Sequence, residues 1–205
     1  GFAGERIDTS FFVSAEVSVQ DPDGRRPEDY SYAGTRFVAE LPDAAAEGRT
    51  AAERTLARVG AQKGASAVLT MLIENRAAGR LVGALLGPLS AQAIQQKRSF
   101  LEGQAGQAIG SPLLDLTDDP LVPKGFGSRL WDGEGLAARQ LPIFEAGVLR
   151  NYYVDTYYGK KLGLPPTTAG SSNLRWKLGA KDLAALLKDV QDGIRQLVSV
   201  GYFVE

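Results

Sequence analysis

The 205-residue chain is 44% hydrophobic and 23% charged, a composition that predicts a globular protein with a buried core and excludes disordered and collagen-like chains. Its 23 basic and 24 acidic residues give a net charge of -1, so we expect neither nucleic acid nor an anionic membrane as a partner. The sequence contains no Cys and no His. This excludes disulfides, thiolate nucleophiles, Ser-His-Asp triads and His-based zinc sites made from its own residues.

The most apolar stretch, residues 65–89, is interrupted by polar and charged residues at 74–76 and by Arg80. Its uninterrupted apolar length is therefore too short to predict a membrane span. Residues 1–10 lack the basic and apolar regions of a signal peptide. From these features we expect a cytoplasmic protein without a membrane partner.

Two strands are predicted near the start of the chain. Small or apolar residues alternate with Ser and Glu from Val13 to Val19, which predicts a half-buried strand within Phe11–Gln20. Asp21–Gly24 has the composition of a turn, because Pro fixes φ and Gly accepts positive φ. A second strand is predicted over Tyr32–Leu41, and we expect the two strands to pair antiparallel.

Helical patterns follow. Thr50 and Glu53 have the spacing of a capping box at the start of a helix predicted over residues 50–62. A short buried strand is predicted over Val68–Ile73. Leu residues recur at helical spacing over residues 77–96, and Gly87-Pro88 predicts that this helix is kinked or restarted there.

The second half of the chain mixes strands and helices. A strand that runs into a loop is predicted over 113–120, and a hairpin is predicted over 141–153 around Ala146-Gly147. Helices are predicted over 155–162, ended by Gly163, and over 181–192. This mixture favours an α+β fold over regular βαβ units.

The densest acidic cluster has two interpretations. It comprises Asp115, Asp118 and Asp119, followed by Asp132 and Glu134. Carboxylate oxygens could hold a hard cation or a substrate amine, but the spacing matches no EF-hand loop. Loop carboxylates more often accept turn and helix-capping hydrogen bonds, and the sequence favours this second interpretation.

Read together, the segments from about Leu69 to Ser172 resemble the TldD/PmbA family, also called the modulator of gyrase family. The residues that carry the resemblance are Ser99-Phe100-Leu101, Gly110-Ser111-Pro112, Asp118-Asp119-Pro120, Gly127-Ser128, Trp131-Asp132-Gly133-Glu134-Gly135, Phe144-Glu145-Ala146-Gly147-Val148-Leu149, Tyr153, Asp155, Lys161-Leu162-Gly163 and Thr168-Ala169-Gly170. The resemblance implies a mostly antiparallel, barrel- or sandwich-like sheet with packed helices. It also implies a single α+β domain over 1–205, corresponding to the middle and C-terminal parts of the family, without the family's N-terminal domain.

In the catalytic subunits of this family, a helix carries H-E-x-x-x-H, whose two histidines bind zinc and whose glutamate can act as a general base. The corresponding stretch here is residues 75–80. Asn75 and Arg80 stand at the histidine positions and Arg76 at the glutamate position, and the Cys that supplies a third ligand is absent. The resemblance therefore implies no metal site in this chain, no cofactor of its own, and zinc in a catalytic partner.

The resemblance implies a PmbA/TldE-like subunit that is inactive alone and pairs with a TldD-like catalytic subunit, or with itself, to cleave unfolded or extended peptides. We expect a peptide substrate to lie as an added β-strand. The substrate-binding candidates are Ser99, Phe100, Asp132, Glu134 and Gly135. One alternative is a non-enzymatic homodimeric peptide-binding or scaffold protein. The least favoured is a hydrolase using Asp132 and Glu134, because no positioned base or oxyanion donor is evident.

Overall fold

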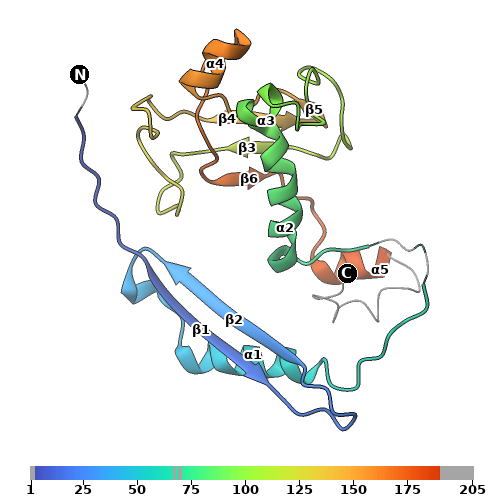
Figure 1. Ribbon diagram of the computed structural model, residues 1–205. Coiled ribbons are helices and arrows are strands. Elements are labelled where there is room, and N and C mark those ends of the chain that lie inside the picture. The colour runs from blue at the N-terminus through green and yellow to red at the C-terminus, as the bar shows by residue number, and fades with distance from the viewer. Residues whose placement is uncertain (1–2, 67, 69–70, 190–205) are drawn as a thin grey trace. The chain divides into compact units, whose positions relative to one another are not determined.

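The computed structural model describes residues 3–66, 68 and 71–189, which divide into two compact units (Figure 1). Residues 74–180 belong to unit 1, and the described residues of 3–73 and 181–189 belong to unit 2. The single domain expected over 1–205 stays a prediction. Within the described residues, none of the helices is long and apolar enough to cross a membrane.

Unit 2 contains a two-stranded antiparallel sheet. Strand β1, Phe11–Ser18, pairs along its whole length with β2, Glu28–Thr35. Side chains of β1 alternate between half-buried and exposed, which confirms the alternation predicted for this strand. The second strand was predicted over Tyr32–Leu41, but it begins and ends earlier, and Val38–Glu40 forms a 3-10 turn, η1.

The early start of β2 has a physical cause in its buried polar residues. Asp29 and Ser31 lie on the face that α1 covers and are only 4% and 5% exposed. Asp29 forms an ion pair with Arg58 at 3.0 Å, and the Ser31 hydroxyl donates to the Glu47 carboxylate. Because these partners compensate for the burial of Asp29 and Ser31, a strand with a polar sequence can still pack against a helix.

Helix α1, Ala44–Leu56, begins earlier than predicted. Its N-cap is Asp43, whose carboxylate accepts hydrogen bonds from the N–H groups of Ala45 and Ala46. The prediction that Thr50 caps this helix was wrong, because Thr50 lies inside it and its hydroxyl donates to the Ala46 carbonyl at 3.0 Å. The Ser/Thr-x-x-Glu spacing therefore occurs in the helix interior here.

The strand predicted over Val68–Ile73 is not present in the described part of that segment. Val68 and residues 71–73 are not in a strand, and Val68 and Met71 are exposed. Residues 69 and 70 lie outside the described residues. A short apolar run without flanking partners does not by itself specify a buried strand.

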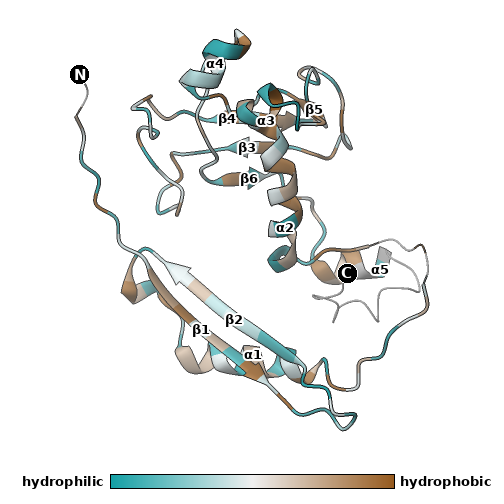
Figure 2. Ribbon diagram, in the orientation of Figure 1, coloured by the Kyte–Doolittle hydropathy of each residue, from teal (hydrophilic) through white to brown (hydrophobic). Residues whose placement is uncertain are grey.

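The kinked helix predicted over 77–96 is confirmed in unit 1. Helix α2, Asn75–Leu86, runs into the 3-10 turn η2, Gly87–Leu89, and the chain resumes as α3, Ala91–Gln95. Pro88 lies in the short turn, and the Ser90 hydroxyl caps α3 by accepting a hydrogen bond from Ala93. The apolar residues of α2 and α3 are brown in Figure 2.

Unit 1 also contains a four-stranded antiparallel sheet in the order β5-β4-β3-β6. Its strands are β3 Leu116–Asp118, β4 Leu141–Glu145, β5 Val148–Leu149 and β6 Leu174–Trp176. The predicted hairpin around Ala146-Gly147 is confirmed by β4 and β5. Strand β6 was not predicted, because its three residues carry no alternating pattern.

Two further helices follow predicted segments. Helix α4, Thr156–Leu162, is capped by the Asp155 carboxylate and ends at Gly163, whose φ of 68° is left-handed, as the sequence predicts. Helix α5, Leu183–Asp189, lies within the predicted range 181–192, of which residues 190–192 lie outside the described residues. The expected class, α+β with antiparallel sheets and packed helices, is confirmed.

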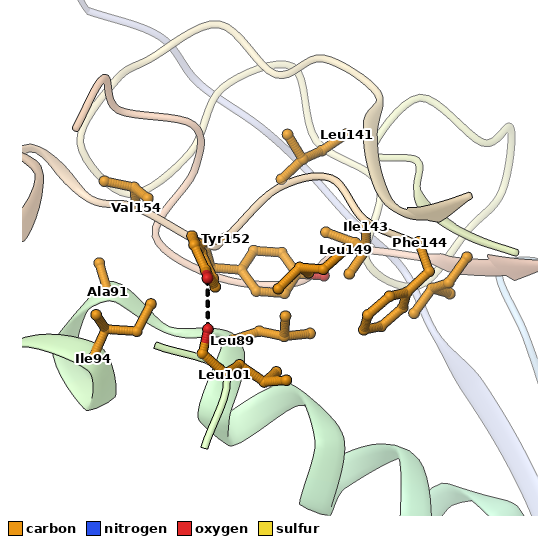
Figure 3. Close-up of a cluster of buried hydrophobic side chains, with 12 residues drawn as sticks. Leu89, Ala91, Ile94, Leu101, Leu141, Ile143, Phe144, Leu149, Tyr152 and Val154 are labelled. Carbon is orange, nitrogen blue, oxygen red and sulfur yellow. Dashed lines mark hydrogen bonds between the residues drawn. The ribbon is translucent and has the colours of Figure 1, made fainter. Parts of the chain in front are cut away.

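The core of unit 1 joins the sheet to η2 and α3 (Figure 3). Its buried residues are Leu89, Ala91, Ile94, Leu101, Leu116, Leu141, Ile143, Phe144, Leu149, Tyr152, Tyr153 and Val154. The Tyr152 hydroxyl donates to the Leu101 carbonyl at 2.6 Å, the contact dashed in Figure 3. This core fixes the ends of the strands from which the candidate site is built.

Candidate functional site

A buried carboxylate, that of Asp118, joins three segments of unit 1. Asp118 ends β3 and is 1% exposed. Its carboxylate accepts hydrogen bonds at 2.8 Å from the Tyr153 hydroxyl and from the Ser172 N–H, and another from the Ser172 hydroxyl. Burial is the largest cause that raises the pKa of Tyr153, and the hydrogen bond to Asp118 raises it further. Tyr153 therefore stays a protonated donor, and the Asp118 carboxylate is used for internal structure.

The next residue, Asp119, is also buried and fully partnered. Its carboxylate accepts hydrogen bonds from the Leu121 N–H at 3.0 Å, the Gln140 amide at 2.8 Å and the Arg175 guanidinium at 3.0 Å. Desolvation raises the pKa of Asp119, but these hydrogen bonds and the Arg175 charge outweigh it and hold the pKa below its ordinary value. Asp119 is therefore an ionised anchor for β6.

A polar hollow of about 340 Å³ opens beside this anchor. Its lining residues are Asp115, Thr117, Gln140, Arg175, Trp176 and Lys177. Both cations in the lining have carboxylate partners: Arg175 contacts Asp119 at 3.0 Å, and Lys177 contacts Asp115 at 3.7 Å. The hollow offers paired charges and the Trp176 side chain, which suits polar groups, but its lining contains no nucleophile next to a base.

Two residues that the sequence analysis did not identify hold the long loop between β3 and β4. The Asn173 side chain accepts from the Gly127 N–H at 2.9 Å and donates to the Asp119 carbonyl at 2.8 Å. The Arg129 guanidinium donates to the carbonyls of Gly170 and Ser171. Neither residue lies in a segment with a periodic hydrophobic pattern, so no sequence signal indicated its role.

The Trp131–Gly135 loop is stabilised by its own carboxylates. One Asp132 oxygen accepts from the N–H groups of Glu134 at 2.9 Å and Leu136 at 3.0 Å. The Glu134 carboxylate accepts from the Thr156 N–H at 2.9 Å and from its hydroxyl, at the first turn of α4. These are the turn and helix-capping hydrogen bonds that the sequence favoured for the acidic cluster.

The other two substrate-binding candidates lie after α3. The Ser99 hydroxyl donates to the Pro88 carbonyl at 2.6 Å and accepts from the Leu101 N–H at 3.0 Å. Phe100 is 70% exposed. Among the described residues, no hydrogen bond or ion pair joins Ser99 or Phe100 to Asp132, Glu134 or Gly135. Substrate binding by these five residues stays a prediction.

The positions expected to correspond to the metal motif lie at the start of α2. Asn75 is the first residue of the helix, and Asn75 and Arg80 are exposed. The Arg76 guanidinium donates twice to the Glu74 carboxylate, at 2.7 and 2.9 Å. This is a bidentate ion pair, so the charge of Arg76, which was expected at the position of the family's glutamate, is matched by the neighbouring Glu74.

The sequence profile described as PmbA/TldA metallopeptidase C-terminal domain matches residues 66–198. This range covers more than half of the chain, and the chain therefore belongs to the TldD/PmbA family. The α+β fold with antiparallel sheets agrees with this assignment.

Relatives and solved structures support the same family. Metalloprotease PmbA of Escherichia coli O157:H7 is 26% identical over 95% of this chain and 42% of its own length. A solved structure from Bacteroides thetaiotaomicron, named a modulator of DNA gyrase, matches with a TM-score of 0.90 and 36% identity over 94% of this chain and 44% of that chain. TldE from Thermococcus kodakarensis, 18% identical, covers 88% of this chain and 43% of its own with a TM-score of 0.66, and shares the fold. The chain thus spans about two fifths of the length of these relatives.

The metallopeptidase description of the matched profile implies a metal ion such as zinc, which proteins hold mainly through His, Cys and carboxylate side chains. The α2 positions offer one carboxamide and two guanidinium groups, and a guanidinium has no lone pair available for a metal. Among the residues that the structure describes, no group of three or more His, Cys, Asp or Glu side chains could hold a metal ion. The donor set at α2 does not fit zinc.

Proposed function

We propose that this chain is a PmbA/TldE-like subunit of a TldD/PmbA-type metallopeptidase assembly that acts on unfolded or extended peptides, and that it supplies no zinc ligands. One combined observation carries the proposal: the family match over residues 66–198 occurs in a chain with neither His nor Cys. Zinc in proteins is held mainly by His, Cys and carboxylates. The ion-paired Arg76 at the α2 position supports the same conclusion.

In this proposal, the zinc and the general base belong to a TldD-like catalytic partner in a cytoplasmic heterodimer. The chain contributes peptide contacts through Ser99, Phe100 and the Asp132–Gly135 loop. Phe100 is 70% exposed and offers an apolar contact to an unfolded peptide. In that loop the N–H groups of Asp132, Glu134 and Gly135 already donate to loop acceptors, so Glu134 and Gly135 offer their backbone carbonyls, at a turn where Gly135 has a φ of 80°.

The test combines metal analysis with peptide hydrolysis. The purified chain alone should contain no stoichiometric zinc and should not cleave an unstructured peptide. Mixed with an H-E-x-x-x-H-bearing relative, it should raise zinc-dependent cleavage above that of the relative alone. Stoichiometric zinc with activity in the chain alone would overturn the proposal. No complex and no added activity, with peptide binding retained by a homodimer, would favour the scaffold alternative.

A matched pair of variants tests the peptide contacts. Phe100→Ala removes an exposed apolar side chain at a candidate position, and Leu113→Ala removes one that is 86% exposed at a position with no assigned role. We expect Phe100→Ala to raise the KM of the mixed assembly severalfold and Leu113→Ala to leave it unchanged. Equal effects of both variants would remove Phe100 from the peptide site.

A further inference from the structure

A hollow of about 410 Å³ lies in unit 2, beside the first residues of β2. Its lining includes Glu16, Arg26, Glu28, Asp29, Tyr30 and Arg58. All of these residues belong to unit 2, so the hollow does not depend on how the two units are placed. Its volume is in the range of pockets that hold small molecules.

The β1–β2 register places three of the lining side chains on one face of the sheet. Glu16 pairs with Tyr30, and Ser18 pairs with Glu28. Successive side chains of a strand point to opposite faces, and Asp29 lies on the face that α1 covers. Glu16, Glu28 and Tyr30 therefore lie on the face of the sheet away from α1 (Figure 1).

The two glutamates of this face repel each other. In this register Glu16 and Glu28 are diagonal neighbours, a relationship that puts Cβ atoms about 7 Å apart. Both side chains are exposed, and neither forms a hydrogen bond or ion pair with any other residue that the structure describes. A positively charged ligand group between them would relieve this repulsion.

The arginines around the hollow differ in the same respect. Arg58 forms an ion pair with Asp29 at 3.0 Å, and Arg25, just outside the lining, forms one with Asp23. The exposed side chain of Arg26 has no such partner within the described part of the chain. The hollow is therefore bordered by two carboxylates and one guanidinium whose charges are not matched by described residues.

We propose that this hollow binds a free basic amino acid, of which lysine is the simplest example. Lysine carries two cationic groups and one anionic group, which is the opposite of the unmatched charges of the lining. Glu16 and Glu28 bind the α-ammonium and side-chain ammonium groups, and Arg26 binds the carboxylate with its planar guanidinium. The ring of Tyr30, half-buried and stacked at 6.1 Å on Tyr32, packs against the aliphatic stem.

Other classes of ligand match these charges less well. A divalent cation such as Ca²⁺ takes six or more oxygen ligands, and the described residues contain no group of three or more His, Cys, Asp or Glu that could hold a metal ion. A polyamine leaves Arg26 unmatched, and a phosphate or dicarboxylate is repelled by both glutamates. The proposal concerns unit 2 and does not depend on the proposed peptidase role.

Titration of the 205-residue chain with lysine and three analogues, followed by amide NMR, tests the proposal. Each analogue lacks one charge: norleucine has no side-chain ammonium, cadaverine has no carboxylate, and Nα-acetyllysine has no α-ammonium. Lysine should shift the amide signals of Glu16, Arg26 and Glu28 saturably. Each analogue should bind about fivefold more weakly, the ratio expected when one exposed ion pair is lost.

Variants assign each charged group of the ligand to its partner. Arg26→Gln should abolish the preference for lysine over cadaverine and keep the preference over norleucine. Glu16→Gln and Glu28→Gln should each abolish the preference over norleucine or over Nα-acetyllysine, and keep the preference over cadaverine. Glu53→Gln removes an exposed carboxylate of α1 outside the lining and should leave every dissociation constant unchanged.

Four results would overturn the proposal. The absence of a saturable shift with lysine would mean that the hollow holds no basic amino acid. Equal affinities of the parent chain for cadaverine and lysine would assign the hollow to polyamines. Equal affinities for Nα-acetyllysine and lysine would assign it to the C-terminal lysine of a peptide. Displacement of lysine by millimolar CaCl₂ or MgCl₂, but not by NaCl of equal ionic strength, would assign it to a divalent cation.

Discussion

The Tyr153 hydroxyl donates a hydrogen bond of 2.8 Å to the Asp118 carboxylate inside unit 1, where the two residues are 4% and 1% exposed. The Tyr153 backbone also bonds to the chain beside α3: its N–H donates to the Leu89 carbonyl, and its carbonyl accepts from the Ala91 N–H. Tyr153 therefore connects the end of β3 to η2 and α3, which are distant in sequence.

Removing the Tyr153 hydroxyl should destabilise the protein without disrupting its packing. Tyr153→Phe leaves Asp118 with its Ser172 donors but with one unsatisfied lone-pair direction in a buried site. We expect the free energy of unfolding to fall by about 1–3 kcal/mol. Urea denaturation measures this change. Tyr157→Phe, at a 59% exposed ring, is the control and should change stability little.

The same tyrosine predicts a change of stability with pH. Burial and Asp118 raise the pKa of Tyr153 in the folded state, so the folded protein holds this proton after the unfolded chain has lost it. Its stabilising contribution is fully present below the unfolded pKa, about 10, and is lost as pH rises above that value. Tyr153→Phe should therefore flatten the decline in stability above about pH 10, by up to about 1.4 kcal/mol per pH unit. Identical slopes for the two proteins would contradict this assignment.

Sequence patterns predicted the features that follow local rules of hydrophobic alternation, turn composition or helix capping. The alternation in β1, the turn at Ala146-Gly147 and the glycine that ends α4 each reflect a local rule that the structure confirms. Strand β2 was misplaced because Asp29 and Ser31 are buried against Arg58 and Glu47, which are distant in sequence. A pairing of that kind is a tertiary property, and no local pattern reveals it.

The Arg175–Asp119 ion pair should contribute more to stability than the neighbouring Lys177–Asp115 pair. Asp119 is 3% exposed and loses its charged partner in Arg175→Met. We expect a loss of about 1.5–3 kcal/mol at neutral pH. Lys177→Met breaks a 3.7 Å pair between more exposed groups and should cost less than about 1 kcal/mol.

The Arg175→Met effect should also depend on pH. The hydrogen bonds that hold the pKa of Asp119 below its ordinary value stabilise the folded state above the unfolded pKa, about 3.9. This contribution is lost as pH falls through the lower folded pKa. Denaturation curves of the variant and the parent chain should therefore converge in acid. An undiminished difference at about pH 2 would mean that Arg175 acts through packing alone.

Variants at Asp132 separate a structural role from a substrate contact. Asp132→Ala removes the acceptor for the Glu134 and Leu136 N–H groups and should cost about 1–3 kcal/mol in unfolding free energy. Asp132→Asn keeps an oxygen at that place and should cost less. If Asp132→Asn retains stability but weakens peptide binding in the mixed assembly, the carboxylate contacts peptide. Retention of both would restrict Asp132 to shaping the loop.

The kinds of hydrogen bond made in the candidate site were predicted better than the residues that make them. The acidic cluster was expected to make turn and capping bonds, and Asp132 and Glu134 do so. The sequence did not indicate the roles of Arg129 and Asn173, which bind the loop between β3 and β4, because these contacts join residues more than 40 positions apart along the chain. Residue type indicates what a side chain can bond, and the fold alone determines which backbone group it reaches.

Substitutions at two adjacent residues in the turn between β4 and β5 should change stability in opposite directions. Ala146 has a φ of 48° and Gly147 a φ of 79°, a left-handed pair typical of two-residue hairpins. A Cβ at Gly147 would lie 2.4 Å from the Gly110 carbonyl oxygen, so Gly147→Ala should cost at least about 1–2 kcal/mol from backbone strain and more from this contact. Ala146→Asn tolerates the left-handed conformation and should stabilise the protein by up to about 1 kcal/mol. Thermal and urea denaturation should show midpoints that move in opposite directions, and a destabilised Ala146→Asn would mean that the turn adopts another conformation.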